Sequence, residues 1–477
     1  MVGVKLKTTN KWKVLCDEEI RLIHEKTLTL LENVGIVIKC PLSRKIFKNE
    51  GAKVSGEKVF IPHGMIEETI KNAPARVTLH GRHPSRDLNL GEGRVNYTSC
   101  FGPVKVRDPG GDKLRPATLE DLEKFTLLSD NLENIACCLF HVRPSEIRPE
   151  LHDLYSAATM LKITDKHIHF SQDNATNTET LIALAEIAAA DAGIKQPIHS
   201  LGGCSTTPLI YDEEVCKKLR LAVAKKIPFF VVSGGIAGAT TPVTLAGTLL
   251  IQNAEVLAGL ALGQLLSPGA PMVYGCFSGG MDMTNGRFVM GGAELAIIQA
   301  ATAQICAFYE IPFGYGSGGW TDAAKPGFQA GLEKGTTLLS TALSGVEVIH
   351  SAAGGMLGGA NIADYIQMMI DDEVCDMVNR FLRGIEVSED TLSIELINHI
   401  GPGGHFLDDL HTTRLFKQEH FIPRLLDRSG TDQGDDTVIS RAKERLEQIL
   451  KTCKPKRPST EACREIDAIV NKIAKEI

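Results

Sequence analysis

Aromatic and polar side chains recur at the ends of a series of short apolar runs in this sequence. Aromatic residues make up only 5% of the chain, so those placed beside glycine-rich run ends carry information. The candidate site residues are Tyr97, Arg143, Gln172, Phe277, Tyr315, Trp320 and His350. Aromatic faces attract cations, quaternary ammonium groups above all. The set predicts a pocket for a small organic cation, with Arg143 or His350 to hold a carboxylate on the same ligand.

For each aromatic residue taken alone, packing in the core is the competing interpretation. Trp320 is the exception, because it lies in the glycine-rich stretch 313–326 rather than in a helical stripe. The glycines of that stretch also raise the possibility of a phosphate cradle. Glycine pairs follow most of the apolar runs, however, and not only the last two, which favours a wide opening over a phosphate site.

No compact acid/base constellation accompanies these residues. We find no lysine inside an apolar run, no close pair of carboxylates at run ends, and no complete metal-ligand set. His167 and His169 form a His-x-His pair on one face of a predicted strand, with Asp173 and His199 as further candidate ligands. A metal-dependent barrel hydrolase centred on this pair is therefore one alternative, and a pair of packed or hydrogen-bonded histidines is the simpler one.

The elements that position these side chains form a regular alternation of strand and helix. Eight apolar or β-branched runs are each followed by an amphipathic helical pattern, which predicts parallel βαβ units. The predicted strands are 95–99, 135–142, 167–171, 198–202, 229–233, 272–277, 313–317 and 346–351. Eight units close a (β/α)₈ TIM barrel, whose chemistry lies where the strands end. The rival is an open doubly wound sheet, but its GxGxxG turn is absent from 97–106.

The predicted α/β fold has three parts. Residues 1–93 form a small α+β extension, 94–385 the barrel, and 386–477 a C-terminal loop with helices. The glycine-rich loop 401–406 either covers the barrel mouth or is a plain connection. The amphipathic terminal helices favour a homo-oligomer.

Composition limits the classes of partner. The net charge of −7 argues against nucleic acid, and no uninterrupted apolar run is long enough to span a bilayer. The N-terminus lacks the apolar core of a signal peptide, and the 12 cysteines are scattered with no CxxC pair. We therefore expect a cytoplasmic protein without membrane, nucleic-acid or structural-zinc partners.

Three segments, in this order, resemble the trimethylamine methyltransferase family. They are CDEEIRLIHEKTLTLLENVGI (16–36), GGWTDAAKPGFQAGLEKGTTLL (318–339) and VEVIHSAAGG (346–355). The resemblance extends over nearly the whole chain and is strongest between residues 97 and 359. Each motif is moderately specific, and their order is more specific than any one of them.

The resemblance implies a TIM barrel that moves a methyl group from an amine to the Co(I) of a corrinoid (cobalamin) carried by a separate protein. Archaeal trimethylamine enzymes keep a pyrrolysine in a segment that corresponds roughly to 321–326, where this chain has ordinary residues. The resemblance therefore implies a pyrrolysine-free member acting on a quaternary amine: glycine betaine first, with proline betaine, carnitine or γ-butyrobetaine as further possibilities. A non-catalytic betaine-binding protein is the remaining alternative.

Overall fold

Eight parallel strands close into a barrel at the centre of the protein. We describe a computed structural model, covering residues 3–6, 11–170, 175–430 and 434–476. The barrel strands are β7 (Arg94–Thr98), β10 (Ile135–Cys138), β11 (His167–Phe170), β12 (His199–Cys204), β14 (Phe229–Ser233), β16 (Met272–Cys276), β19 (Phe313–Ser317) and β20 (Val348–His350). The last strand pairs with the first, with Ile349 opposite Tyr97. The predicted (β/α)₈ barrel is confirmed.

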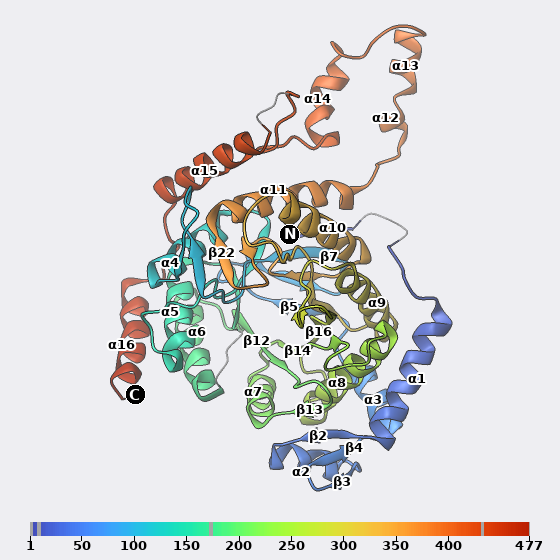
Figure 1. Cartoon of the computed structure of the whole chain (residues 1–477), viewed down its shortest axis with the longest axis vertical. Helices are drawn as coiled ribbons and strands as arrows, with labels where there is room; N and C mark the ends of the chain where they lie inside the picture. The colour runs from blue at the N-terminus through green and yellow to red at the C-terminus, as the bar shows by residue number, and fades with distance from the viewer. Residues whose placement is uncertain (1–2, 7–10, 171–174, 431–433, 477) are drawn as a thin grey trace.

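One long helix follows each barrel strand and packs outside it (Figure 1). These helices are α4 (Leu119–Asn131), α5 (His152–Ile163), α6 (Thr178–Asp191), α7 (Glu213–Ala224), α8 (Leu245–Leu266), α9 (Ala293–Tyr309), α10 (Phe328–Ser344) and α11 (Tyr365–Arg383). By length and composition α8 alone among the described helices could cross a membrane. Because 72% of its most apolar window is buried inside the protein, it reads as a core helix.

The N-terminal segment is joined to the barrel by backbone pairing as well as by packing. Its helices α1 (Asp17–Asn33) and α3 (His63–Asn72) lie against α8. Its strand β2 (Ile36–Ile38) pairs with β13 (Ile210–Tyr211), which belongs to the loop after β12. This pairing fixes the course of one loop at the carboxyl ends of the barrel strands.

Short strands that the sequence did not predict build up the rim of the barrel. They are β8 (Lys105–Arg107), β9 (Leu114–Pro116), β15 (Ile236–Ala237), β17 (Gly279–Asp282), β18 (Arg287–Phe288), β21 (Met356–Leu357) and β22 (Ile362–Asp364). β22 pairs with β8, so the loop after β20 is bonded to the loop after β7. The rim is therefore made of small sheets rather than of free loops.

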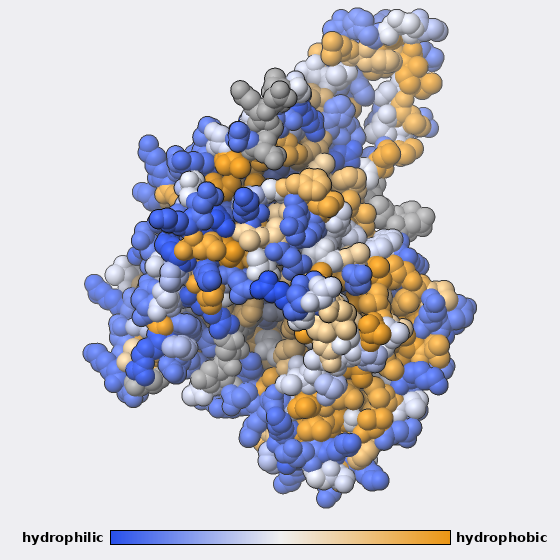
Figure 2. Space-filling view, in the orientation of Figure 1, coloured by the Kyte–Doolittle hydropathy of each residue, from blue (hydrophilic) through white to orange (hydrophobic). Residues whose placement is uncertain are grey.

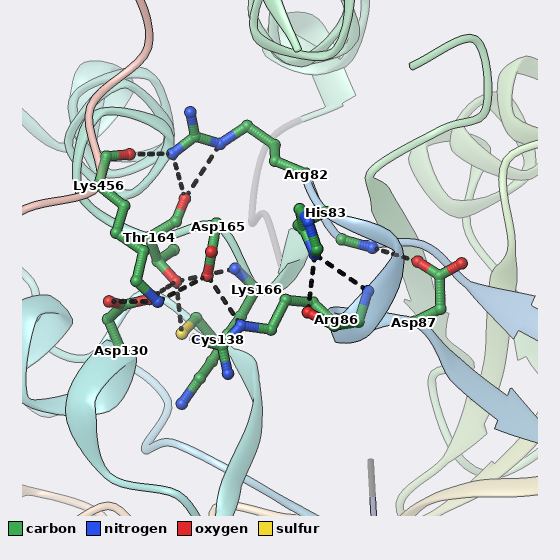
Figure 3. Close-up of polar contacts among 12 residues, drawn as sticks. Arg82, His83, Arg86, Asp87, Asp130, Cys138, Thr164, Asp165, Lys166 and Lys456 are labelled. Carbon is green, nitrogen blue, oxygen red and sulfur yellow. Dashed lines mark hydrogen bonds and ion pairs between the residues drawn. The ribbon is translucent and has the colours of Figure 1, made fainter. Parts of the chain in front are cut away.

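The C-terminal helices α15 (Gly434–Thr452) and α16 (Thr460–Glu476) pack against the barrel helices α4, α5, α6 and α11. The linker between them is held by a polar network beneath β11 (Figure 3). Lys456 Nζ donates to Asp165 at 3.0 Å and pairs with Asp130 at 3.2 Å, while Arg82 Nη2 donates to the carbonyl of Lys456 at 2.5 Å. These contacts anchor the linker to the barrel.

Between α11 and α15 the chain forms a projecting arm, which we define as residues 385–423. It contains α12 (Glu389–Leu392), α13 (Ile394–Ile400) and α14 (Leu410–Glu419), and it extends away from the barrel (Figure 1). The loop 401–406 lies between α13 and α14 at the far end of the arm. Of the two interpretations of this loop, the plain connection fits the structure, because the helices that flank it carry it away from the barrel mouth. The arm exposes apolar side chains, which include Ile385, Leu407 and Leu410, and orange patches mark its surface in Figure 2.

Candidate active site

A cavity of about 300 Å³ lies within the barrel at the carboxyl half of its strands. Strands β11, β12, β14 and β19 supply its walls, and residues of α7 and residues that follow β7 and β16 complete it. The lining residues are Phe101, His169, Gly202, Gly203, Cys204, Val215, Lys218, Val232, Phe277 and Tyr315. Three of these side chains are Phe or Tyr rings, and none is a carboxylate. Lys218 is the one charged side chain among the described lining residues, so the lining offers aromatic rings to a cationic group of a compact ligand and a lysine to an anionic one.

Tyr315 and His350 form a stacked pair beside this cavity. Their ring centroids are 3.8 Å apart and the ring planes differ by 27°. Tyr315 lies in a strand yet has φ of +61°, at an irregularity where the register between β16 and β19 shifts. Ser351, directly after His350, has φ of +57°. Non-glycine residues held in this region cost free energy and concentrate at functional sites.

Two glycines of the barrel wall make room for the protein's own rings. A Cβ on Gly234 would lie 2.3 Å from the Phe277 ring, and a Cβ on Gly202 would lie 3.1 Å from the His169 ring. The expectation that such glycines leave a wide opening is wrong at both positions, since aromatic side chains fill the space. Glycine here lets Phe277 and His169 lie flat against the backbone and shape the cavity.

His167 and His169 are hydrogen-bonded within the barrel. His167 Nε2 and His169 Nδ1 each lie 2.9 Å from Ser200 Oγ, and His167 Nδ1 donates to the His80 carbonyl at 2.8 Å. In the part of the chain that the structure describes, no group of three or more His, Cys, Asp or Glu side chains is placed to hold a metal ion. The hydrolase alternative is not favoured, and the hydrogen-bonded interpretation of the pair is confirmed.

Trp320 contacts both the backbone and the ring of His350, one member of the stacked pair. Its indole Nε1 donates to the His350 carbonyl at 2.7 Å, and its ring lies edge-on to the His350 ring with centroids 6.3 Å apart. The side chain is buried in a cluster that includes Phe277 and Cys100. Trp320 therefore holds His350 and Phe277 in place without itself lining the cavity.

Arg143 lies over two aromatic rings at the edge of the cavity. Its guanidinium carbon is 5.9 Å from the centroid of Phe101 and 5.7 Å from that of Phe140. Phe101 in turn lies 5.9 Å from His350, centroid to centroid. Arg143 is thus connected to the cavity through Phe101. The predicted site residue Gln172 lies outside the described residues.

Among the predicted site residues that the structure describes, Tyr97 lies apart from the others. Its hydroxyl donates to Asn379 Oδ1 on α11 at 2.9 Å, and the side chain is 2% exposed. Because successive side chains of a strand point to opposite faces, this contact places Tyr97 in the layer between barrel and helices. Assigning Tyr97 to the cation pocket was wrong: the strand-end position was right, but the side of the strand was not.

Phe101 and Lys218 line the cavity but were not among the predicted site residues. Phe101 lies three residues beyond the end of β7, and Lys218 reaches the cavity from α7, where it is 6% exposed. A lysine on the apolar side of an amphipathic helix is the signal that could have identified Lys218, because a helical lysine in a soluble protein is rarely buried. His169 was noted as a metal candidate and not as a wall of the pocket.

Buried charged groups brace the loops around the cavity. Glu255 on α8 accepts hydrogen bonds from Ser205, Thr207 and Ser233, and so fixes the ends of β12 and β14. Lys334 on α10 donates to the Gly319 carbonyl and pairs with Asp371 on α11 at 3.0 Å. These contacts lie outside the cavity, so we assign them to positioning.

The sequence matches the family model described as trimethylamine methyltransferase over residues 3–477. The chain belongs to the trimethylamine methyltransferase family. It is 32% identical over 474 residues to a glycine betaine methyltransferase of Desulfitobacterium hafniense, with 98% of each chain covered. It is 33% identical over 474 residues to a trimethylamine methyltransferase of Methanosarcina barkeri, with 96% of this chain and 94% of the relative covered. Relatives of this family thus include methyltransferases for both amines.

A solved structure shares the fold of this family member. The monomethylamine methyltransferase of Methanosarcina barkeri aligns with a TM-score of 0.54 at 13% identity, covering 93% of this chain and 90% of that one. At 13% sequence identity the structural similarity is evidence for the shared fold alone. It agrees with the closed barrel described above.

Proposed function

We propose that this chain is a methyltransferase that moves a methyl group from a quaternary amine to the Co(I) of a corrinoid held by a separate protein. The observation that carries the proposal is the cavity at the strand ends, walled by Phe101, Phe277 and Tyr315 and, among its described lining residues, free of carboxylates. Aromatic walls hold a cation through their π faces. Membership of a methyltransferase family supports the reaction type.

A quaternary nitrogen needs no proton donor to leave. The carbon–nitrogen bond breaks with its electron pair going to nitrogen, so the product amine is neutral and the aromatic walls lose their hold on it. The corrinoid supplies the electron pair that accepts the methyl group. The residues of this chain orient the methyl group along the line of attack and keep water from the cation. The lack of a carboxylic acid among the described lining residues is consistent with this chemistry.

Glycine betaine is the first choice of substrate. It combines a trimethylammonium head with a carboxylate, and a relative that is 32% identical is a glycine betaine methyltransferase. The head would lie between Phe277 and Tyr315, and His350, Arg143 or the undescribed Gln172 would orient the carboxylate. Proline betaine, carnitine and γ-butyrobetaine are larger members of the same class. A cytoplasmic location follows from the proposal, because Co(I) requires a reducing compartment.

The proposal is tested by mixing the protein with a reduced corrinoid protein and adding candidate amines one at a time. We expect glycine betaine to convert the Co(I) spectrum to that of the methylated corrinoid, and trimethylamine to leave it unchanged. The control is the same corrinoid mixture without the enzyme. No spectral change with any quaternary amine, in the presence of a corrinoid that other methyl donors can methylate, would contradict the proposal.

Two further results would favour the alternatives. Betaine affinity measured by calorimetry, without transfer of methyl groups to any corrinoid, would indicate a binding protein. Bound zinc together with a hydrolytic activity lost on chelation would indicate the hydrolase.

A further inference from the structure

One buried nitrogen in the cavity wall has no partner. His169 is 4% exposed and lines the cavity, and its Nε2 makes no hydrogen bond to any described residue. A buried polar atom without a partner is costly, so its presence in a cavity wall indicates contact with a ligand. What the ligand presents there depends on whether Nε2 carries a proton.

The hydrogen bonds behind His169 settle where its proton lies. His167 Nδ1 must be the donor to the His80 carbonyl, since a carbonyl only accepts. His167 is neutral, because burial lowers its pKa to about 4, so its Nε2 accepts the single hydrogen of Ser200. Ser200 Oγ then has no hydrogen left for His169, and His169 Nδ1 must donate to it.

These hydrogen bonds therefore make His169 the Nδ1–H tautomer. Burial lowers the pKa of His169 well below its usual value, so the ring stays neutral and Nε2 keeps its lone pair. The lone pair is the negative end of the imidazole dipole, and the low dielectric of a buried site strengthens its field. Such an atom attracts an ammonium head and repels a carboxylate.

We propose that His169 Nε2 contacts the methylammonium end of the substrate and so sets the direction in which the substrate enters the cavity. The inference rests on the proposed function, which supplies the cation. It deepens that function by assigning the two ends of a zwitterion to different parts of the cavity. The carboxylate then lies away from His169 Nε2, on the side of the Phe101–Arg143 contact.

The test compares two ligands that differ only in charge at the branched centre. Glycine betaine has nitrogen where 3,3-dimethylbutanoate has carbon, so both share one shape and one carboxylate. In calorimetry with His169→Phe, which keeps a ring but removes the lone pair, we expect the Kd of glycine betaine to rise about tenfold. The Kd of the carbon isostere should stay within about twofold of its wild-type value.

The matched control is His199→Phe on the neighbouring strand β12. His199 is also buried, its two ring nitrogens also lack partners among the described residues, and it does not line the cavity. It should leave both affinities unchanged. If His169→Phe weakens both ligands equally, or neither, His169 does not contact the ammonium end and the proposal is overturned.

The tautomer can be measured without any ligand. In protein labelled with ¹⁵N-histidine, the signals that vanish in His169→Phe should show a protonated Nδ1 and a bare Nε2. A protonated Nε2 overturns the proposal whatever the enzyme's activity. Betaine binding that depends on His169, in a protein that transfers no methyl group, would support the inference while contradicting the proposed function.

Discussion

At the scale of single residues, the site depends on side chains held in unfavourable backbone conformations. Tyr315 and Ser351 have positive φ values; Tyr315 forms the ring stack with His350, and Ser351 directly follows His350. The strain is offset by contacts behind the stack, of which the bond from Trp320 to the His350 carbonyl is the most direct. The residue that the sequence singled out therefore acts on the cavity through His350.

Trp320→Phe should lower kcat/KM for methyl transfer about 10- to 100-fold with little loss of stability. The variant keeps an aromatic ring in the buried cluster but loses the hydrogen bond that positions His350, and small displacements of positioning groups have effects of this size. Steady-state kinetics with the corrinoid acceptor measures the change. The only other tryptophan, Trp12, is 36% exposed, so Trp12→Phe is the control. Equal kinetics for both variants would contradict the role of Trp320.

At the scale of elements, buried ion pairs connect the outer helices to the strand-end loops. Lys334 and Asp371 are 1% exposed each, and together they hold the Gly319 carbonyl and the Gly355 amide. Gly319 belongs to the loop after β19 and Gly355 to the loop after β20. Movement of α10 relative to α11 would thus displace Trp320 and His350 together.

Lys334→Met should lower the free energy of unfolding by about 3–5 kcal/mol, because it leaves the Asp371 charge buried without its partner. Denaturation in urea, followed by circular dichroism, measures the loss. The double variant Lys334→Met/Asp371→Leu should recover much of it, since no lone charge remains. Lys124→Met, which breaks an exposed pair with Glu120, should cost less than about 0.5 kcal/mol. A double variant no more stable than the single one would show that the pair is not the cause.

At the scale of the whole molecule, a set of buried neutral histidines makes stability sensitive to acid. Burial lowers the pKa of each: to about 3 for three of them, to about 4 for a fourth, and well below the usual value for the fifth. They are His141, His167, His169, His199 and His350. The unfolded chain takes up protons on these rings near pH 6.5, whereas the folded chain does not.

Stability should therefore fall as the pH drops from about 6.5 toward 3 or 4, by about 1.4 kcal/mol per pH unit for each such histidine. Above pH 6.5 both states are neutral at these rings and the effect vanishes. Urea unfolding at pH 7.5, 6.5 and 5.5 measures the slope. His199→Phe should reduce it by one histidine's share, and substitution of the exposed His405 should not. An unfolding free energy that stays constant from pH 7.5 to 5.5 would refute the prediction.

The sequence determined the barrel, because buried parallel strands read as short apolar runs and their helices as amphipathic patterns. All eight predicted strands are present, from β7 to β20. The sequence also pointed to Phe277, Tyr315 and His350, since residues that follow barrel strands meet at one face. It did not determine the rim sheets, whose strands of two to four residues are too short to show a period.

Only the tertiary structure decided which way each side chain faces. Successive side chains of a strand point to opposite faces, so a shift of one residue moves a side chain from the cavity to the layer between strands and helices. Tyr97 lies in that layer and contacts Asn379 on α11. Lys218 and Phe101 come to the cavity from a helix and a loop, by contacts that have no local pattern. The tautomer of His169 depends on four residues from three separate segments, so it exists only once the chain has folded.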